Sequence, residues 1–495
     1  MSLYIKKHSN LNKSKNLFST LIISVIFYIF YLALSDLIDI PDQKYLIFLF
    51  SWIGIVIYIY IGYSWKETTG SIFTPYMIFL TFFFLFNFGQ PLMWALGIHL
   101  PNEIGAFSIY TGYDVTAIKD IVASQMTVIM SAILFHLGAL ATTIKIDKNK
   151  NAKKSCLDKN EFFEDKFMLK TIFHISILIG IIAIPITLIN AFVDLQIAKT
   201  FGYRALYYSE YARSGFAYST FISFWFFPSL IGMLIGSKFN KSIRFVIYTI
   251  FGLYTVLNIL AGNRGPWILK LTILIWISHV SYKPIKKKQL IMYSTLSIIG
   301  IYIMDAIVSL RNVGITYDSV IGLLSITNSS VIKAFFELGS SMKPLVFLQM
   351  YGWDIWPYGN TYLIAIGGLI TNKFLDVLGV QYAVVGNFFK DYLGLGYGPG
   401  FSIVAESVVN FGPLLAPVFM IPLGCWLSLL LKTDKTEVYT QKPLKFLFIS
   451  GTLDALIPIN RNGIHVYLKE WFYGVVVLCL LIYFINQFRI LKYKQ

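Results

Sequence analysis

Apolar positions along this chain fall in long blocks that are separated by mostly short polar connections. Twelve of these blocks are long enough to cross, or nearly cross, a bilayer core about 30 Å thick as helices. They cover residues 17–38, 45–63, 72–97, 121–144, 167–195, 216–236, 245–261, 266–281, 290–310, 413–431, 446–459 and 464–488. The pattern predicts an all-α polytopic protein of about 12 transmembrane helices, with residues 1–495 forming a single integral membrane domain.

One connection is much longer than the others. Residues 311–400 lie between two apolar segments, contain Trp353 and Trp356 among many aromatic residues, and carry too little charge to stay unfolded. A connection of this length is usually either functional or disordered, and the aromatic content favours a functional one. Residues 330–338 read as a helix with Gly339 as its C-cap. We therefore expect a folded, mainly helical external loop, which we call the cap.

The apolar stretch that follows the cap is too long for one span. Residues 401–431 would reach roughly 46 Å as a continuous helix at about 1.5 Å per residue. The Gly412-Pro413 pair predicts a break, because proline cannot continue the hydrogen bonding of a helix. We expect residues 401–412 to form a half-helix that dips into the outer leaflet, since interrupted helices in membrane proteins often line a cavity.

The distribution of charged residues predicts how the chain is oriented in the membrane. The chain is 56% hydrophobic and 13% charged, and its net charge is +16. If both termini are cytoplasmic, 27 of the 41 Lys and Arg residues fall in cytoplasmic segments and 12 in external ones. The positive charge therefore needs no nucleic-acid partner. It predicts a multi-pass membrane protein with both termini inside and the cap outside.

The arginines depart from this trend. Five of the seven lie on the predicted outer side, and they are Arg204, Arg213, Arg264, Arg311 and Arg461. A guanidinium group can bind two phosphate oxygens at once, which lysine cannot match. The set indicates a site for a phosphorylated or otherwise anionic ligand, in which Tyr203 and other aromatic residues would stack on sugar rings. Contacts with lipid headgroups or helix ends are the alternative.

Ionisable residues within the predicted spans point to the same side. They are Lys270, Asp305, Glu406, Asp454, Lys469 and Glu470, and all fall in the outer halves of their spans. Charges inside a membrane are costly and are functional candidates by default. The alternative is that they form structural ion pairs, for example Lys270 with Asp305.

Two residues are candidates for a general base. His465 follows Arg461 by four residues, one turn along the same helix face. Glu406 stands on the predicted half-helix, directly after the glycine-rich exit of the cap. Either side chain could take a proton from a hydroxyl group. The chain lacks HxxxH, HExxH and external DxD motifs, so we expect no metal and no cofactor.

Two short motifs carry a resemblance to a known family. One is Gly262-Asn263-Arg264-Gly265-Pro266 after a span, and the other is the sequence GYGPGFSIVAE, which ends at Glu406 and contains Gly396, Gly398 and Gly400. With the long external loop, they resemble the Wzy-type polymerases of O-antigen and capsule repeat units. Members of that group have two external loops in which an Arg is followed, after ten residues, by a Gly.

In this chain the same spacing joins Arg204 to Gly215 and Arg311 to Gly322. The resemblance implies a GT-C-like architecture and a metal-independent, inverting glycosyl transfer at the outer face of the bacterial cytoplasmic (inner) membrane. The growing glycan would move from undecaprenyl diphosphate to the non-reducing end of a new lipid-linked repeat unit. Arg204, Arg264, Arg311, Arg461 and Lys270 would then bind the diphosphate, and a chain-length regulator would be a further partner.

Two other classes of protein remain open. An O-antigen ligase, or another lipid-linked glycosyltransferase, shares the spans, the large external loop and the Arg/His chemistry. A flippase for lipid-linked oligosaccharides is a transporter, and it should place its charges near the membrane midplane and show related halves with short loops.

Overall fold

The structure is a computed structural model, and it confirms the all-α class. It describes residues 2–37, 44–98, 118–154, 165–202, 205–206, 217–263, 265–286, 288–289, 291–292, 295, 330–369, 372–377, 379–381, 383–394, 400–433 and 437–494. Every regular element within these residues is a helix.

Nine helical segments of the described chain are long and apolar enough to cross a membrane. They are formed by α1 (Ser2–Leu37), α2 (Lys44–Thr69), α3 (Pro75–Ala95), α4 (Ile118–Lys154), α5 (Lys166–Phe201), α6 (Ala217–Ser223) with α7 (Phe226–Gly236), α8 (Lys241–Ala261), α17 (Ile403–Leu430), and α19 (Ile464–Trp471) with the π-helical turn Phe472–Val477 and α20 (Leu478–Lys494). Each matches one of the twelve predicted segments. Two more match the shorter helices α9 (Gly265–Ser281) and α18 (Pro443–Leu456), while the predicted segment 290–310 lies almost wholly outside the described residues.

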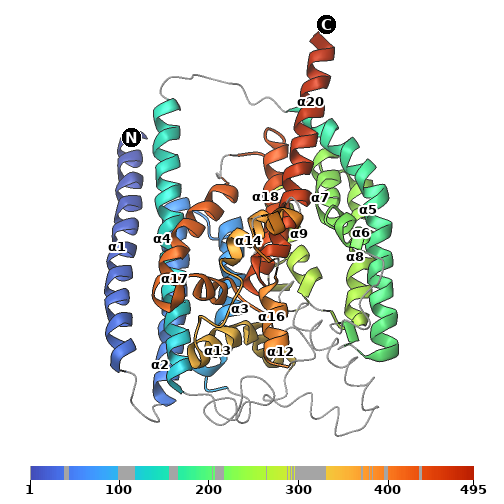
Figure 1. The fold of residues 1–495 in the computed structure, drawn as a ribbon. Helices are drawn as coiled ribbons and strands as arrows, with labels where there is room; N and C mark the ends of the chain where they lie inside the picture. Colours follow the sequence, from blue (N-terminus) through green and yellow to red (C-terminus); the bar gives the residue numbers. More distant parts are fainter. Residues whose placement is uncertain are drawn as a thin grey trace.

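The helices stand side by side, with both chain termini at the same end of the bundle (Figure 1). Helices α1, α2 and α4 lie on one side, and α5, α7 and α8 lie on the other. Between α4 and α17 the backbones approach closely, because a Cβ atom built at Gly138 or Gly424 would lie 2.1 or 2.0 Å from a carbonyl oxygen of the other helix. Only glycine fits at these two positions.

Helix α17 is broken where the sequence predicts it. Gly412 has φ 74° and ψ 167°, which is not helical. Pro417 has no N–H group, so the carbonyl of Pro413 cannot pair within the helix. The Tyr31 hydroxyl of α1 donates to this carbonyl at 3.0 Å and replaces the missing bond. The break is thus built from glycine, proline and one hydroxyl from a neighbouring helix.

The described part of the cap is mainly helical. Its elements are α12 (Ser330–Gly339), a 3-10 turn (Ser340–Met342), α13 (Lys343–Tyr351), α14 (Thr361–Gly367), α15 (Asn372–Val377) and α16 (Val385–Tyr392). Helix α12 begins at residue 330, as predicted. It ends at Gly339, one residue after the predicted end and at the position predicted for the C-cap. It packs on α3, where a Cβ atom at Gly339 would lie 2.2 Å from the backbone nitrogen of Gln90. The cap is therefore docked onto the bundle rather than suspended above it.

Candidate functional site

Glu406 lies at a junction of three helices. It stands in the first turn of α17, which begins after Ser402, whose hydroxyl caps the helix by accepting from the N–H of Ala405. The Glu406 side chain is buried, with 1% exposed. One carboxylate oxygen accepts from the Thr361 hydroxyl at 2.8 Å, and the other accepts from the Ile464 N–H at 2.9 Å. The carboxylate thus joins α17 to α14 of the cap and to α19.

Asn410 completes this junction. It stands one turn after Glu406, and its side-chain amide donates to the Thr361 hydroxyl at 2.7 Å. Its amide oxygen accepts from the Thr361 N–H, also at 2.7 Å. Because the Thr361 hydroxyl accepts from Asn410, its own proton is directed to Glu406. The start of α14 is therefore fixed by two side chains from α17.

The loop between α18 and α19 is held from both ends. The Phe401 N–H donates to the Arg461 carbonyl at 2.8 Å, so the exit of the cap bonds directly to this loop. Gly400, just before Phe401, has φ +75° and lies in the left-handed region that favours glycine. At the other end of the loop, a Cβ atom at Gly463 would lie 3.3 Å from Nδ1 of His465 and 3.8 Å from Oε1 of Glu406. The two candidate bases thus both lie close to Gly463.

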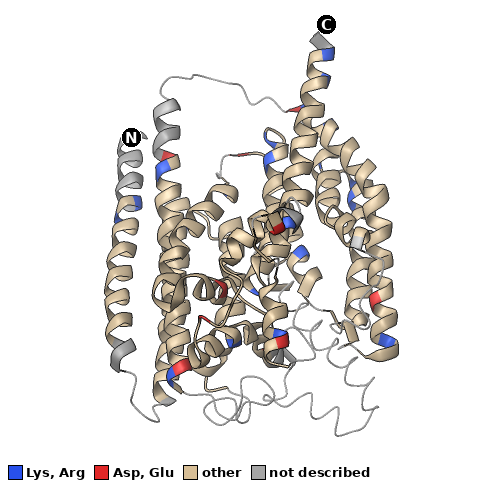
Figure 2. Ribbon diagram, in the orientation of Figure 1, with Lys and Arg blue, Asp and Glu red and all other residues tan. Residues whose placement is uncertain are grey.

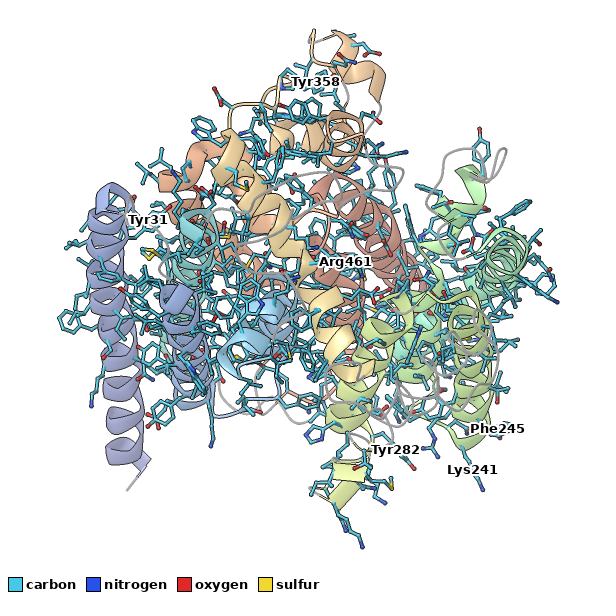
Figure 3. All side chains as sticks on the ribbon, turned by 90° about the horizontal axis from the view of Figure 1, so that it is seen from below. Tyr31, Lys241, Phe245, Tyr282, Tyr358 and Arg461 are labelled. Atoms are coloured by element: carbon cyan, nitrogen blue, oxygen red, sulfur yellow. The ribbon has the colours of Figure 1, made fainter. Side chains whose placement is uncertain are left out.

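Arg461 lies next to the start of α9. A Cβ atom at Gly265 would lie 4.0 Å from Nη1 of Arg461, and Gly265 directly follows Arg264 in the chain. Seen from below, Arg461 lies near the middle of the molecule (Figure 3). It also interacts electrostatically with Tyr467, whose hydroxyl accepts from the Asn462 side chain at 3.0 Å. The structure therefore brings the loop after α18 to the glycine-rich motif at the start of α9.

Lys270 forms an ion pair within the bundle. Its ammonium group is 2.6 Å from a carboxylate oxygen of Asp454 on α18, and the two side chains are 15% and 5% exposed. Glu470 on α19 also interacts electrostatically with Lys270. Lys270 thus forms a structural ion pair, which is the alternative that the sequence left open, and Asp305, the example partner named there, lies outside the described residues.

The predicted site residues therefore divide into three groups. Glu406, His465, Arg461 and Gly400 meet around the loop after α18, whereas Lys270 is paired with Asp454. Outside the described residues lie Tyr203, Arg204, Gly215, Arg264, Arg311, Gly322, Gly396 and Gly398.

Sequence reasoning missed Thr361 and Asn410. The spacing of four residues between Glu406 and Asn410 places both on one helix face and was an available signal. No comparable pattern marked Thr361. Among the described residues, no group of three or more His, Cys, Asp or Glu side chains could hold a metal ion.

These helices define a polytopic all-α membrane protein whose candidate site is the buried polar junction between its cap and its bundle. The chain belongs to the O-antigen polysaccharide polymerase Wzy family, whose model matches residues 17–494. In general terms it is thus an O-antigen repeat-unit polymerase, a membrane enzyme of the glycosyltransferase type that acts on lipid-linked oligosaccharide repeat units. No curated protein and no solved structure matches the chain.

Proposed function

We propose that this chain transfers the growing glycan from undecaprenyl diphosphate to the non-reducing end of a new lipid-linked repeat unit. The observation that carries the proposal is the meeting of Arg461, Glu406 and His465 at the contact between the cap and the bundle. A loop that carries an arginine and a histidine, and that is held by a buried carboxylate, suits a reaction in which an anionic group leaves while a hydroxyl group loses its proton.

The leaving diphosphate is held by arginine side chains in this proposal. The Arg461 guanidinium lies beside Gly265, and Arg264 is the residue directly before Gly265 in the chain. Arg204 and Arg311 complete the set, with Lys270 nearby and Tyr203 stacking on a sugar. Guanidinium groups donate paired hydrogen bonds to phosphate oxygens and stabilise the charge that develops on the leaving group. This supports transfer in which arginines, and no metal ion, neutralise the diphosphate.

His465 is the base that we propose for the acceptor hydroxyl. The hydroxyl oxygen attacks the anomeric carbon as the bond from that carbon to the diphosphate oxygen breaks, and its proton passes to the imidazole. A single displacement of this kind inverts the anomeric centre. Both Glu406 oxygens already accept hydrogen bonds. We therefore assign Glu406 to positioning the Arg461–His465 loop, and its action as the base is the alternative.

The site is proposed to face the periplasm or exterior. Both termini lie at one end of the bundle, where Figure 2 shows basic residues on α1, α18 and α20. An excess of basic residues marks the cytoplasmic side. A reporter enzyme that works only outside the cytoplasm should be active when it is fused after Asn360. Activity of a reporter that works only in the cytoplasm, fused at the same point, would reverse the topology. A chain-length regulator would then meet the protein at this membrane.

The surface glycan of a deletion strain tests the proposed function. If the chain is the polymerase, the strain should carry a single repeat unit on its anchor, and the intact gene should restore the ladder of longer chains. A strain with no glycan on the anchor would indicate a ligase instead.

A further inference from the structure

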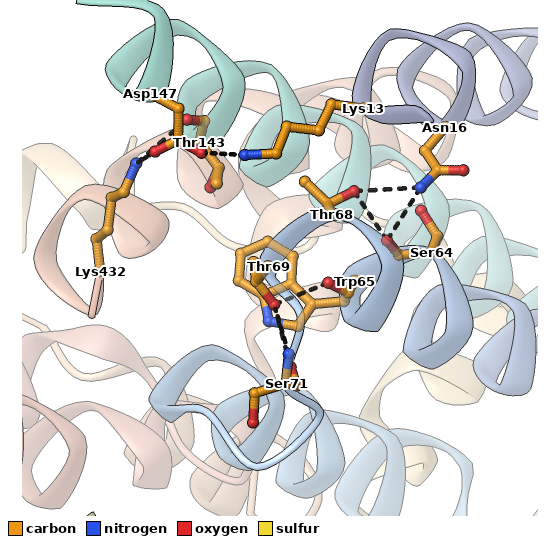
Figure 4. Close-up of polar contacts among 10 residues, drawn as sticks. All are labelled: Lys13, Asn16, Ser64, Trp65, Thr68, Thr69, Ser71, Thr143, Asp147 and Lys432. Carbon is orange, nitrogen blue, oxygen red and sulfur yellow. Dashed lines mark hydrogen bonds and ion pairs between the residues drawn. The ribbon is translucent and has the colours of Figure 1, made fainter. Parts of the chain in front are cut away.

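A polar cavity of about 150 Å³ lies at the end of the bundle that holds both termini. It is lined by residues of α1, α2, α3, α4 and the end of α17, and Figure 4 shows polar contacts around it. Its lining includes Lys13, Trp65, Thr68, Thr143, Asp147 and Lys432. The volume equals that of about five water molecules, well below the roughly 300 Å³ of a typical small-molecule pocket. A headgroup-sized ligand fits such a space better than a whole metabolite.

The cavity lies at the level where the membrane spans end. Lys13 lies four residues before the apolar segment 17–38, and Asp147 lies three residues after the apolar segment 121–144. The span Tyr45–Thr69 ends at Thr69, which also lines the cavity. Apolar spans end where the hydrocarbon core gives way to the headgroup region. The cavity therefore opens among lipid headgroups.

The charged groups of the cavity leave it net positive. Lys13 is 2.7 Å from one oxygen of Asp147, and Lys432 is 2.5 Å from the other. Two ammonium groups against one carboxylate give a charge of +1. Each ammonium carries three donors. Lys13 uses one of them on Asp147, and Lys432 uses two, on Asp147 and on the Thr143 carbonyl. Three N–H donors thus have no acceptor among the described residues.

We propose that this cavity binds the phosphate of an anionic phospholipid from the leaflet at that end of the bundle. A phosphate oxygen accepts hydrogen bonds from ammonium groups, and its single negative charge balances the +1 charge of the cavity. Beyond Lys13, α1 presents an apolar surface on which Phe18 is 63%, Val25 51% and Ile26 63% exposed. Acyl chains can pack along that surface, whereas free phosphate ions gain nothing from it.

The test uses the full chain, purified in neutral detergent and stripped of lipid. Thermal unfolding is measured with increasing phosphatidylglycerol, phosphatidylcholine or inorganic phosphate, since a ligand that binds the folded state raises the unfolding temperature. The variants are Lys13→Gln and Asp147→Asn, and Lys15→Gln is the matched control, because Lys15 is exposed on the same helix. None of these residues belongs to the proposed catalytic site, so polymerase activity is measured separately.

The expected result is a rise in unfolding temperature with phosphatidylglycerol alone. Lys13→Gln should weaken the apparent affinity about tenfold or more, because a charge-assisted hydrogen bond is lost. Lys15→Gln should match the wild type. Asp147→Asn should keep or strengthen binding, because it breaks the same ion pair as Lys13→Gln but raises the cavity charge to +2.

Four results would overturn the proposal. Equal loss of the lipid effect in Lys13→Gln and Asp147→Asn would mean that the ion pair only fastens α1 to α4. Equal stabilisation by phosphatidylcholine would show that the cavity is not specific for an anionic lipid. Unchanged affinity for phosphatidylglycerol in Lys13→Gln would show that the lipid does not bind in this cavity. The same stabilisation by inorganic phosphate would assign the cavity to the free ion.

Discussion

The Thr361 hydroxyl donates a 2.8 Å hydrogen bond to Glu406, and this contact fastens a cap helix to the first turn of α17. The other oxygen of the same carboxylate holds the first N–H of α19, at Ile464. One buried side chain therefore sets the position of the cap relative to the loop that carries Arg461 and His465. Any role of the cap in placing a sugar substrate depends on this junction.

Thr361→Val should loosen the junction while leaving Glu406 in place. Loss of a hydrogen bond to a charged group costs about 1.5–3 kcal/mol, so both the unfolding temperature and the polymerisation rate should fall. Glu406→Gln should behave similarly, because an NH₂ group replaces one carboxylate oxygen and then faces a hydrogen-bond donor. Ser340→Ala is the control, since the Ser340 hydroxyl donates to the Glu337 carbonyl within the cap and not to α17. A rate loss of several decades in Glu406→Gln, with Thr361→Val near normal, would make Glu406 the base.

The Lys270–Asp454 ion pair predicts that a second substitution restores stability lost by the first, although the two residues lie on helices far apart in the sequence. Lys270→Met leaves the Asp454 carboxylate buried without its partner, which should cost about 3–5 kcal/mol of unfolding free energy. The double variant Lys270→Met/Asp454→Leu should recover most of that loss, as thermal unfolding in detergent can measure. If Lys270 also binds the diphosphate, the recovered protein should have a raised KM for the donor. A single variant as stable as the wild type would contradict the pairing.

Arg461→Lys keeps the positive charge but loses the planar fork of the guanidinium group. We expect donor use, measured as kcat/KM, to fall about ten- to a hundredfold, with the same result for Arg264→Lys and Arg311→Lys. Arg489→Lys is the control, because this arginine lies on α20 and contacts Thr171. Full polymer from the three variants at normal protein level would reduce these arginines to ordinary headgroup contacts.

The docking of the cap predicts a sharp difference between two glycines. Gly339→Ala would place a Cβ atom 2.2 Å from the backbone of α3, so α12 must move away. Overpacking of this kind costs about 1–3 kcal/mol, and a lower unfolding temperature is expected. Gly386→Ala, on cap helix α16, meets nothing within 4 Å and should be nearly neutral. Equal effects of the two substitutions would argue against close packing of α12 on α3.

The sequence predicted what depends on local chemistry. Span lengths follow from apolar runs, and the break at Gly412 follows from the Gly-Pro pair. The pairing of Lys270 was not predictable, because hydropathy gives the depth of a residue in the membrane and not the helix that it faces. Thr361 was missed for a similar reason, since a lone threonine in a long connection carries no periodic signal. Asn410 could have been found, because it shares a helix face with Glu406.

The base assignment is tested with His465→Ala and the control His174→Ala. His174 lies on α5 and bonds the carbonyl of Lys170, far along the chain from the site. Removal of a general base should slow turnover by about two to four decades while donor binding is retained. The control should polymerise normally. Near-normal turnover in both His465→Ala and Glu406→Gln would leave Asp454, Glu470 or the phosphate of the substrate as the next candidate.

The most direct test of the account is polymerisation by the purified protein with a lipid-linked repeat unit as its only substrate. The account predicts a ladder of lipid-linked products that grows by one repeat unit at a time, with one undecaprenyl diphosphate released per bond formed. Products that never exceed one repeat unit, or glycan that moves only to a different acceptor, would contradict it.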